Sequence, residues 1–115
     1  MGIHIERQCF SGLAGALDDI SRRGLWPTTY ATDHATGAEP HWHTEDVHAY
    51  VIDGELDFLD GEGGRHSIEP GDKITIPART VHAEGEITDP VVLIVALPEP
   101  LSQDRFLKQH APGAL

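Results

Sequence analysis

The chain of 115 residues carries 19 Asp and Glu against eight Lys and Arg, which gives a formal net charge of −11. Such an acidic surface repels phosphate backbones and anionic lipid headgroups, so we expect neither nucleic acid nor a membrane as partner. A single cysteine, Cys9, excludes an intrachain disulfide, and the N-terminal residues lack the pattern of a signal peptide. We therefore expect a cytoplasmic protein whose residues 1–115 form one domain, the usual size for a chain of this length.

A short amphipathic helix is predicted between Ser11 and Gly24. Ser11 is a favourable N-cap, and two arginines followed by a glycine are typical of a helix end. Leu13, Leu17 and Ile20 share one face at helical spacing. The sequence therefore predicts that this helix begins the fold.

The pattern then changes to short β segments separated by turns. Asp53-Gly54 is typical of a hairpin, and Pro70-Gly71-Asp72 of a tight turn. Segments of this length and spacing predict an all-β fold, a sandwich or an antiparallel barrel. The tail from Ser102 to His110 is compatible with a second short helix. The predicted strands cover residues 28–34, 47–52, 56–59, 73–76, 81–85 and 91–97.

Histidine is unusually abundant, with eight residues, and two of them flank Trp42. Because side chains alternate between the faces of a strand, His41 and His43 point the same way and can bind one ion. A chain of this composition contains about half of one H-x-H pattern by chance, so the pair alone is weak evidence.

A second segment carries Gly71, Pro77 and His82. These residue types occur at these offsets by chance roughly 0.06 times per chain, so the segment is the stronger signal. It predicts a turn, a strand, a proline turn and a second strand. The proline turn fixes the direction of His82, as a metal site requires.

Taken together, the two segments resemble the two motifs of the cupin family, G-x5-H-x-H-x3/4-E-x6-G and G-x5-P-x-G-x2-H-x3-N. The motifs span residues 41–54 and 71–86, under half of the chain. The resemblance implies a small single-domain cupin, an antiparallel β-barrel of the jelly-roll type. It also implies one divalent metal ion held by three histidines. The matching residues are His41, His43 and Gly54 in the first motif, and Gly71, Pro77 and His82 in the second.

The chain also departs from the family pattern. The motif's glutamate falls on Val47, which cannot bind a metal, so the usual three-histidine, one-glutamate set lacks its carboxylate. His48 fits the longer spacing but should point away from the site, and Glu45 lies in an expected loop. Whether His48, Glu45 or only water completes the coordination stays open. Arg79 and Glu86 replace the second motif's middle glycine and closing asparagine.

Several other residues have two interpretations. Glu84 shares the facing of His82, so it either orients a ligand imidazole or is solvated. Tyr30 and His34 either line the site or lie on the surface. Trp42 and Tyr50 are out of phase with the inward set, which predicts an aromatic outer face covered in a homodimer. The inward residues are Val47, Ala49, Val51, Ile74 and Ile76 or their alternates, which predicts an apolar pocket for a small organic molecule.

The residues leave the metal and the reaction open. Imidazole ligands suit Fe, Zn, Ni, Cu and Mn, with iron favoured if the protein is an oxygenase. The first hypothesis is a non-haem Fe(II) dioxygenase acting on a small oxygenated organic molecule. The alternatives are a metal-dependent isomerase or lyase, and a binding or sensing cupin without turnover. The sequence assigns no catalytic residue.

Overall fold

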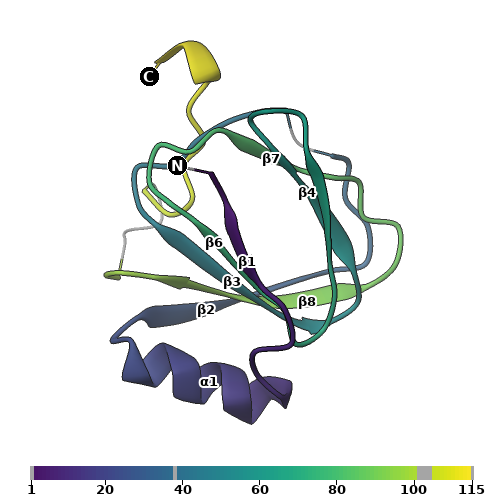
Figure 1. Ribbon diagram of the computed structural model, residues 1–115, viewed down its shortest axis with the longest axis vertical. Coiled ribbons are helices and arrows are strands. Elements are labelled where there is room, and N and C mark those ends of the chain that lie inside the picture. The colour runs from purple at the N-terminus through teal and green to yellow at the C-terminus, as the bar shows by residue number, and fades with distance from the viewer. Residues whose placement is uncertain (1, 38, 101–104, 115) are drawn as a thin grey trace.

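β-Branched and aromatic residues in short runs, separated by Gly and Pro turns, form eight strands in two antiparallel sheets. The computed structural model describes residues 2–37, 39–100 and 105–114. The order is β1-β6-β3-β8-β2 in the larger sheet and β5-β4-β7 in the smaller one, and the two face each other (Figure 1). The strands are β1 His4–Glu6, β2 Trp26–Thr32, β3 Val47–Asp53, β4 Leu56–Asp60, β5 Arg65–Ile68, β6 Lys73–Ile76, β7 His82–Glu84 and β8 Val91–Leu97. This arrangement confirms the predicted all-β fold. Outside the named strands, isolated bridges pair Ala35 with Ile87, His41 with His82 and Trp42 with His110.

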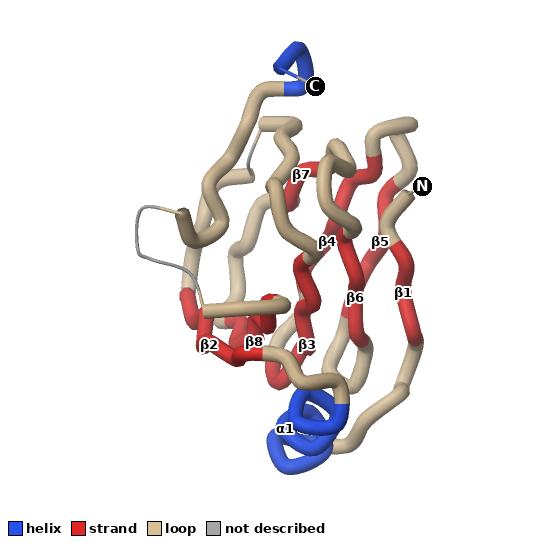
Figure 2. Tube along the Cα trace, turned by 90° about the vertical axis from the view of Figure 1, so that its left-hand side faces the viewer, coloured by secondary structure: helices blue, strands red, loops and turns tan. Residues whose placement is uncertain are grey.

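The predicted helix is present as α1, Gly12–Arg22, and lies against the outer face of the larger sheet (Figure 2). Ser11 occupies the N-cap without a side-chain hydrogen bond, and Gly24 follows the helix with a φ of +69°. The packed face consists of Ala16 and Ile20, whereas Leu13 and Leu17 remain exposed. The face predicted from leucine spacing is therefore only partly the buried one.

The space between the sheets is filled by the inward residues of both. As predicted from alternation, Val47, Ala49 and Val51 of β3 point into this core. They meet Leu56 and Phe58 from the smaller sheet, so β3 has one face in the core and one face under α1. Alternation thus fixes which side chains of β3 reach the interior cavity.

Gly54 fixes the turn that joins the two sheets. It has a φ of +82°, and a Cβ at this position would lie 2.2 Å from the carbonyl oxygen of Pro90. Any side chain would therefore clash with the backbone, in addition to being strained by the left-handed conformation. This close approach explains why the first motif ends on a glycine.

Trp42 and Tyr50 are not an exposed aromatic face, so this prediction is wrong. Trp42 is 7% exposed because it stacks on His110, and its Nε1 donates to the carbonyl oxygen of Ala111 at 2.9 Å. Tyr50 is fully buried under α1 and meets Phe10 edge-on. Both side chains are covered within one protomer, so neither provides a dimer interface.

The predicted C-terminal helix over residues 102–110 is absent from residues 105–110, the part of it that the structure describes. Residues 105–110 form a turn and then extended chain, and His110 pairs with Trp42 in an isolated bridge. The remaining residues of the predicted helix, 102–104, lie outside the described ones. Within the described residues 105–114, one helical turn is present, a 3-10 turn at Pro112–Ala114. No helix in the described part of the chain is long and apolar enough to cross a membrane.

Candidate metal centre

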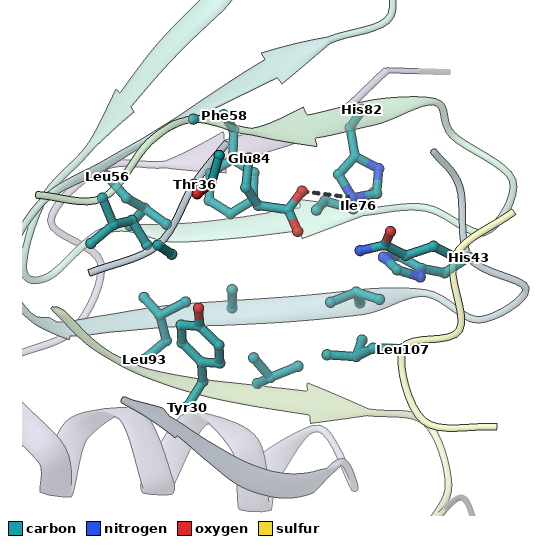
Figure 3. Close-up of a pocket in the computed structure, with 17 residues that line it drawn as sticks. Tyr30, Thr36, His43, Leu56, Phe58, Ile76, His82, Glu84, Leu93 and Leu107 are labelled. Carbon is teal, nitrogen blue, oxygen red and sulfur yellow. Dashed lines mark ion pairs between the residues drawn. The ribbon is translucent and has the colours of Figure 1, made fainter. Parts of the chain in front are cut away.

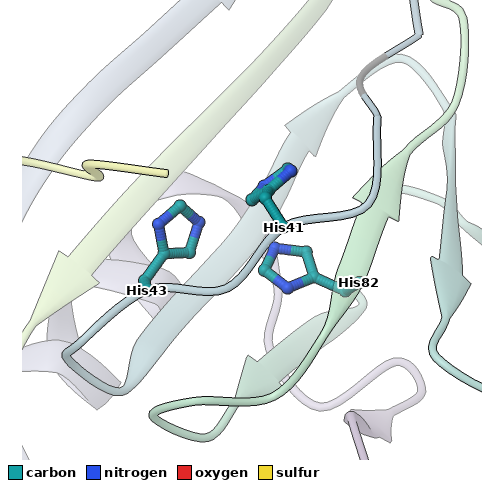
Figure 4. Close-up of side chains that lie close together, drawn as sticks. All are labelled: His41, His43 and His82. Carbon is teal, nitrogen blue, oxygen red and sulfur yellow. The ribbon is translucent and has the colours of Figure 1, made fainter. Parts of the chain in front are cut away.

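His41, His43 and His82 converge at one end of the space between the sheets (Figure 4). Their potential ligand atoms all lie within 4.8 Å of one another, and the ring centroids are 4.5–5.1 Å apart. The backbones of His41 and His82 exchange two hydrogen bonds of 2.9 Å, although 40 residues separate them in the chain. The structure therefore brings together all three histidines that the sequence singled out.

The proline turn before His82 is hydrogen-bonded to the segment that carries the other two histidines. The backbone N–H of Arg79 donates to the carbonyl oxygen of His43 at 2.8 Å. The N–H of Ala78 donates to Oδ1 of Asp46, also at 2.8 Å. Arg79 has a φ of +64°, the left-handed region that favours glycine. The position where the cupin motif has a glycine thus adopts a conformation that favours glycine, although the residue here is arginine.

Backbone carbonyls determine which nitrogen of each ring is free. Each Nδ1 lies at hydrogen-bond distance from a carbonyl oxygen, which can only accept. Nδ1 must therefore carry the proton, and Nε2 keeps its lone pair for a ligand. The acceptors are Glu39 for His41 at 2.7 Å, Thr80 for His82 at 2.9 Å and Lys108 for His43 at 3.0 Å.

The three rings are almost completely buried, with 1–5% of each residue exposed. Burial lowers the pKa of His43 and of His82, because the charged imidazolium loses solvation. Burial also opposes protonation of His41, but the nearby Glu84 carboxylate and the Glu39 carbonyl outweigh it and raise its pKa. Two of the three rings thus favour the neutral form that binds metal ions.

Glu84 points into the same site from β7 (Figure 3). Its Oε2 is 3.3 Å from Nε2 of His41 and 3.9 Å from Nε2 of His82. Burial opposes ionisation of Glu84, but the adjacent His41 outweighs it, and the pKa of Glu84 is lowered. From the sequence, alternation with His82 predicted that Glu84 lies on this side of the strand. It did not predict that the carboxylate directly approaches the rings.

Two buried polar atoms in this cluster have no hydrogen-bond partner among the described residues. They are Nε2 of His41 and Oε2 of Glu84, which are close without being aligned for a hydrogen bond. Unpaired buried polar atoms are uncommon in folded proteins and signal an absent ion or water. A cation between them would satisfy both, so the donor set fits a divalent metal ion.

A cavity of about 270 Å³ adjoins the histidines. Its wall is largely apolar, and Val47 lines it, as predicted from its position on β3. Tyr30 and Glu84 contribute polar groups, together with Thr36 and Gln109, which sequence reasoning did not identify. The volume is close to the lower end of ordinary small-molecule sites and suits a small, mainly apolar molecule with a polar group near the histidines.

The remaining sequence candidates lie elsewhere. His48 is on the other face of β3, with Nδ1 3.5 Å from Oγ1 of Thr75. Oε2 of Glu45 accepts a hydrogen bond from Thr44 and lies 3.6 Å from Arg105, outside the histidine cluster. His34 is exposed and does not line the cavity.

The model of the cupin domain family matches residues 30–97, more than half of the chain. The chain belongs to the cupin family. The match includes all three histidines of the cluster, and the resemblance inferred from the two motifs is confirmed.

Solved structures with the same cupin fold come from proteins of different activities. A DUF861 family protein from Thermotoga maritima is 17% identical with a TM-score of 0.58, over 83% of this chain and 98% of that one. DMSP lyase DddQ from Ruegeria pomeroyi is 18% identical with a TM-score of 0.59, over 74% of this chain and 46% of that one. Acireductone dioxygenase from Bacillus anthracis, with cadmium in its active centre, is 23% identical with a TM-score of 0.59, over 72% of this chain and 57% of that one.

This cupin spans about half the length of the lyase and the dioxygenase. Identities this low establish the fold and leave the chemistry to the site itself. Comparison with curated proteins gave no significant match.

Proposed function

We propose that this cupin binds one divalent transition-metal ion through Nε2 of His41, His43 and His82 and acts on a small organic molecule in the adjoining cavity. The observation that carries the proposal is the convergence of three buried rings, each with Nδ1 engaged by a carbonyl, beside a preformed apolar cavity. Fe, Zn, Ni, Mn and Cu all accept imidazole ligands, with expected metal–nitrogen distances of about 2.0–2.2 Å.

The activity that we favour is that of a non-haem Fe(II) dioxygenase. Bound Fe(II) would supply the ability to bind O2 and a chelating substrate together. The three histidines lie together beside the cavity, so exogenous ligands in the cavity would reach a bound ion. A dioxygenase is among the proteins with the same fold, but the proposal rests on the ligand set and not on that likeness.

The chain's own residues define the substrate class. The wall includes the apolar side chains of Val47, Leu56 and Phe58, which suit an apolar carbon skeleton. A small molecule with adjacent oxygen donors, such as a diketone or a hydroxy acid, would place those donors at the histidines and its carbon skeleton against this wall. We therefore propose a small oxygenated organic molecule as substrate.

A metal-dependent lyase or isomerase is the second candidate, and one observation favours it. The Tyr30 hydroxyl points into the cavity on the side opposite Glu84 (Figure 3). A phenol and a carboxylate facing one substrate provide a proton donor and a proton acceptor. In this reaction the metal would polarise a carbonyl, and these two side chains would move the proton.

Metal analysis followed by two assays tests these proposals. We expect one metal ion per wild-type chain and little in a folded His82→Ala variant; equal content would contradict the metal site. Apoprotein reconstituted anaerobically with Fe(II) should consume O2 with a member of a panel of diketones, hydroxy acids and thiols. Turnover under anaerobic conditions with zinc or nickel, without O2 uptake by the iron form, would identify the lyase or isomerase. Tight ligand binding without turnover would identify a binding or sensing protein.

The single-domain organisation, the cytoplasmic location and the homodimer remain predictions. Trp42 and Tyr50, which were predicted to form the dimer interface, are buried within the protomer. Sedimentation at micromolar concentration tests the dimer directly, and a monomer would contradict it.

A further inference from the structure

We infer that Glu84 is a fourth protein ligand of this metal ion, supplying from β7 the carboxylate that the cupin motif supplies from the position of Val47. The inference rests on the proposed metal binding by the three histidines. With Glu84 as a ligand, the donor set again consists of three histidines and one carboxylate, but the carboxylate comes from a different strand. The position of Glu84 is not a ligand position in either cupin motif.

The distances agree with two donors sharing one ion. Two donor atoms at about 2.1 Å from a metal, with an angle of about 90–110° between them, lie about 3.0–3.4 Å apart. Oε2 of Glu84 is 3.3 Å from Nε2 of His41, which falls in that range. Its distance of 3.9 Å from Nε2 of His82 corresponds to a wider angle about the same ion.

An outer role for Glu84, in which it orients a ligand ring, does not fit the hydrogen bonds. A carboxylate orients an imidazole by accepting its N–H. The Nδ1 protons of all three rings already meet the carbonyls of Glu39, Lys108 and Thr80. Once each Nε2 binds the ion, no ring N–H is left for Glu84.

Glu84 also has no other partner that would explain its position. Its Oε2 is buried and makes no hydrogen bond with any described residue. The side chain as a whole is 34% exposed, so the unpaired atom is this one oxygen on the side of the histidines. A buried oxygen of an ionised carboxylate without a partner is unfavourable, and a divalent cation removes that penalty. The nearest basic groups are the histidine rings themselves.

The position of Glu84 follows from strand geometry. His82 and Glu84 are two residues apart on β7, so their side chains leave the strand on the same face. Glu84 is paired with Phe58 of β4, which holds this part of β7 in the smaller sheet. Val47 reaches the same cavity from the larger sheet, so the carboxylate has moved from one wall of the cavity to the opposite wall.

A carboxylate ligand from β7 rather than from β3 affects which exogenous ligand this cupin accepts. With one anionic protein ligand, a divalent centre keeps a net charge of +1, and a six-coordinate ion keeps two positions for exogenous donors. A monoanionic bidentate ligand then neutralises the centre. Because Glu84 occupies the side of β7, we expect those donors on the side of the cavity that Val47 and Tyr30 line.

Titration of the metal-free protein with Co²⁺ tests the inference. Glu84→Gln keeps the shape and removes the charge, and Glu86→Gln removes the same charge from an exposed position two residues away. We expect Glu84→Gln to raise the Kd for Co²⁺ by about 100-fold, which is the largest effect expected for a residue that only hydrogen-bonds to a metal ligand. We also expect the visible absorption bands of bound Co²⁺ to change. Glu86→Gln should bind within about twofold of wild type with the same bands, because no described contact joins it to the cluster. Thermal melting of the metal-free variants checks that both are folded.

A crystal structure of the zinc form gives a second readout. We expect a Glu84 oxygen at about 2.0–2.2 Å from zinc. A carboxylate separated from the ion by water would overturn the inference, as would unchanged Co²⁺ affinity and bands in Glu84→Gln. If the wild type binds Co²⁺ and His82→Ala does not, such a result refutes the role of Glu84 and leaves the histidine site standing. If wild type and His82→Ala bind equally poorly, both proposals fail.

Discussion

Asp19 of α1 accepts a hydrogen bond from the Tyr50 hydroxyl of β3 at 2.6 Å, across the contact between the helix and the larger sheet. The same carboxylate oxygen accepts from Nε of Arg23 at 2.8 Å and from Nζ of Lys73 at 3.3 Å. Lys73 is only 1% exposed, so Asp19 neutralises a buried ammonium group beneath the helix. The rest of this contact is apolar, and the polar group therefore fixes how the helix sits on the sheet.

Replacement of Asp19 by Asn should destabilise the protein by about 3 kcal/mol, because it leaves the buried Lys73 without a counter-charge. Asp18→Asn is the matched control, since the described partner of Asp18 is the exposed Arg22 at the helix surface. That change should alter the free energy of unfolding by less than about 1 kcal/mol. Urea unfolding at neutral pH measures both, and equal effects would contradict the assigned role of Asp19.

The stability of the wild type should also fall at acidic pH through Asp19. Burial opposes its ionisation, but the Tyr50 hydroxyl and the Arg23 guanidinium outweigh it and lower the pKa of Asp19 from 3.8 to about 2. A carboxyl with a depressed pKa in the folded state stabilises fully above its unfolded pKa, and the contribution is lost as pH falls through the folded pKa. The difference in unfolding free energy between wild type and Asp19→Asn should therefore shrink between about pH 4 and pH 2. A constant difference over this range would show that Asp19 does not titrate as stated.

Arg79→Gly should stabilise the protein by about 1 kcal/mol, because Arg79 holds a left-handed backbone conformation with a φ of +64°. Arg79→Ala is the control, since it removes the side chain and keeps the strain. Chemical unfolding of the three proteins compares them. Stabilisation by alanine equal to that by glycine would mean that the side chain, and not the backbone, was unfavourable.

Val47→Glu should tighten metal binding, because the residue lines the cavity and would place a carboxylate at the family's usual position. In the metal-free protein the same change buries an unpaired charge and should lower the melting temperature. The rise in melting temperature on adding metal should consequently be larger than in wild type. Affinity for bidentate ligands should drop as an open position is lost. Unchanged metal affinity would show that the side chain does not reach the ion.

Removal of residues 105–115 should weaken metal binding by about 10-fold or more, because His43 loses the Lys108 carbonyl that holds its Nδ1 proton. The deletion also uncovers Trp42, whose fluorescence in a Trp26→Phe background should shift to longer wavelength. A shorter deletion, of residues 112–115 alone, leaves Lys108 and the stacked His110 in place and serves as control. Equal metal affinity for the two truncated proteins would contradict the role of the carbonyl.

Much of the site could be predicted because it depends on local chain geometry. Alternation along a strand placed His41 with His43 and Val47 with the cavity, and the proline turn oriented His82. Each of these features is determined within a few residues. The fold class followed for the same reason, from the lengths of the β runs and the turns between them.

The features that were missed depend on segments distant in the sequence. Alternation placed Trp42 and Tyr50 outside the space between the sheets, but it does not say what covers that outer face. The tail and α1 cover it through contacts 60 or more residues away for Trp42 and about 30 for Tyr50. The direct approach of Glu84 to His41 likewise requires the pairing of segments that the sequence alone does not align.

The region that matches the cupin family ends at residue 97, yet Lys108 fixes the ring of His43, and Leu107 and Gln109 line the cavity. A segment beyond the matched region thus lines part of the cavity. Substitution of the Leu107 and Gln109 side chains changes neither motif and should alter which molecules the cavity accepts. Ligand preference in such a chain can diverge through the side chains of Leu107 and Gln109, while the backbone carbonyl of Lys108 continues to hold His43.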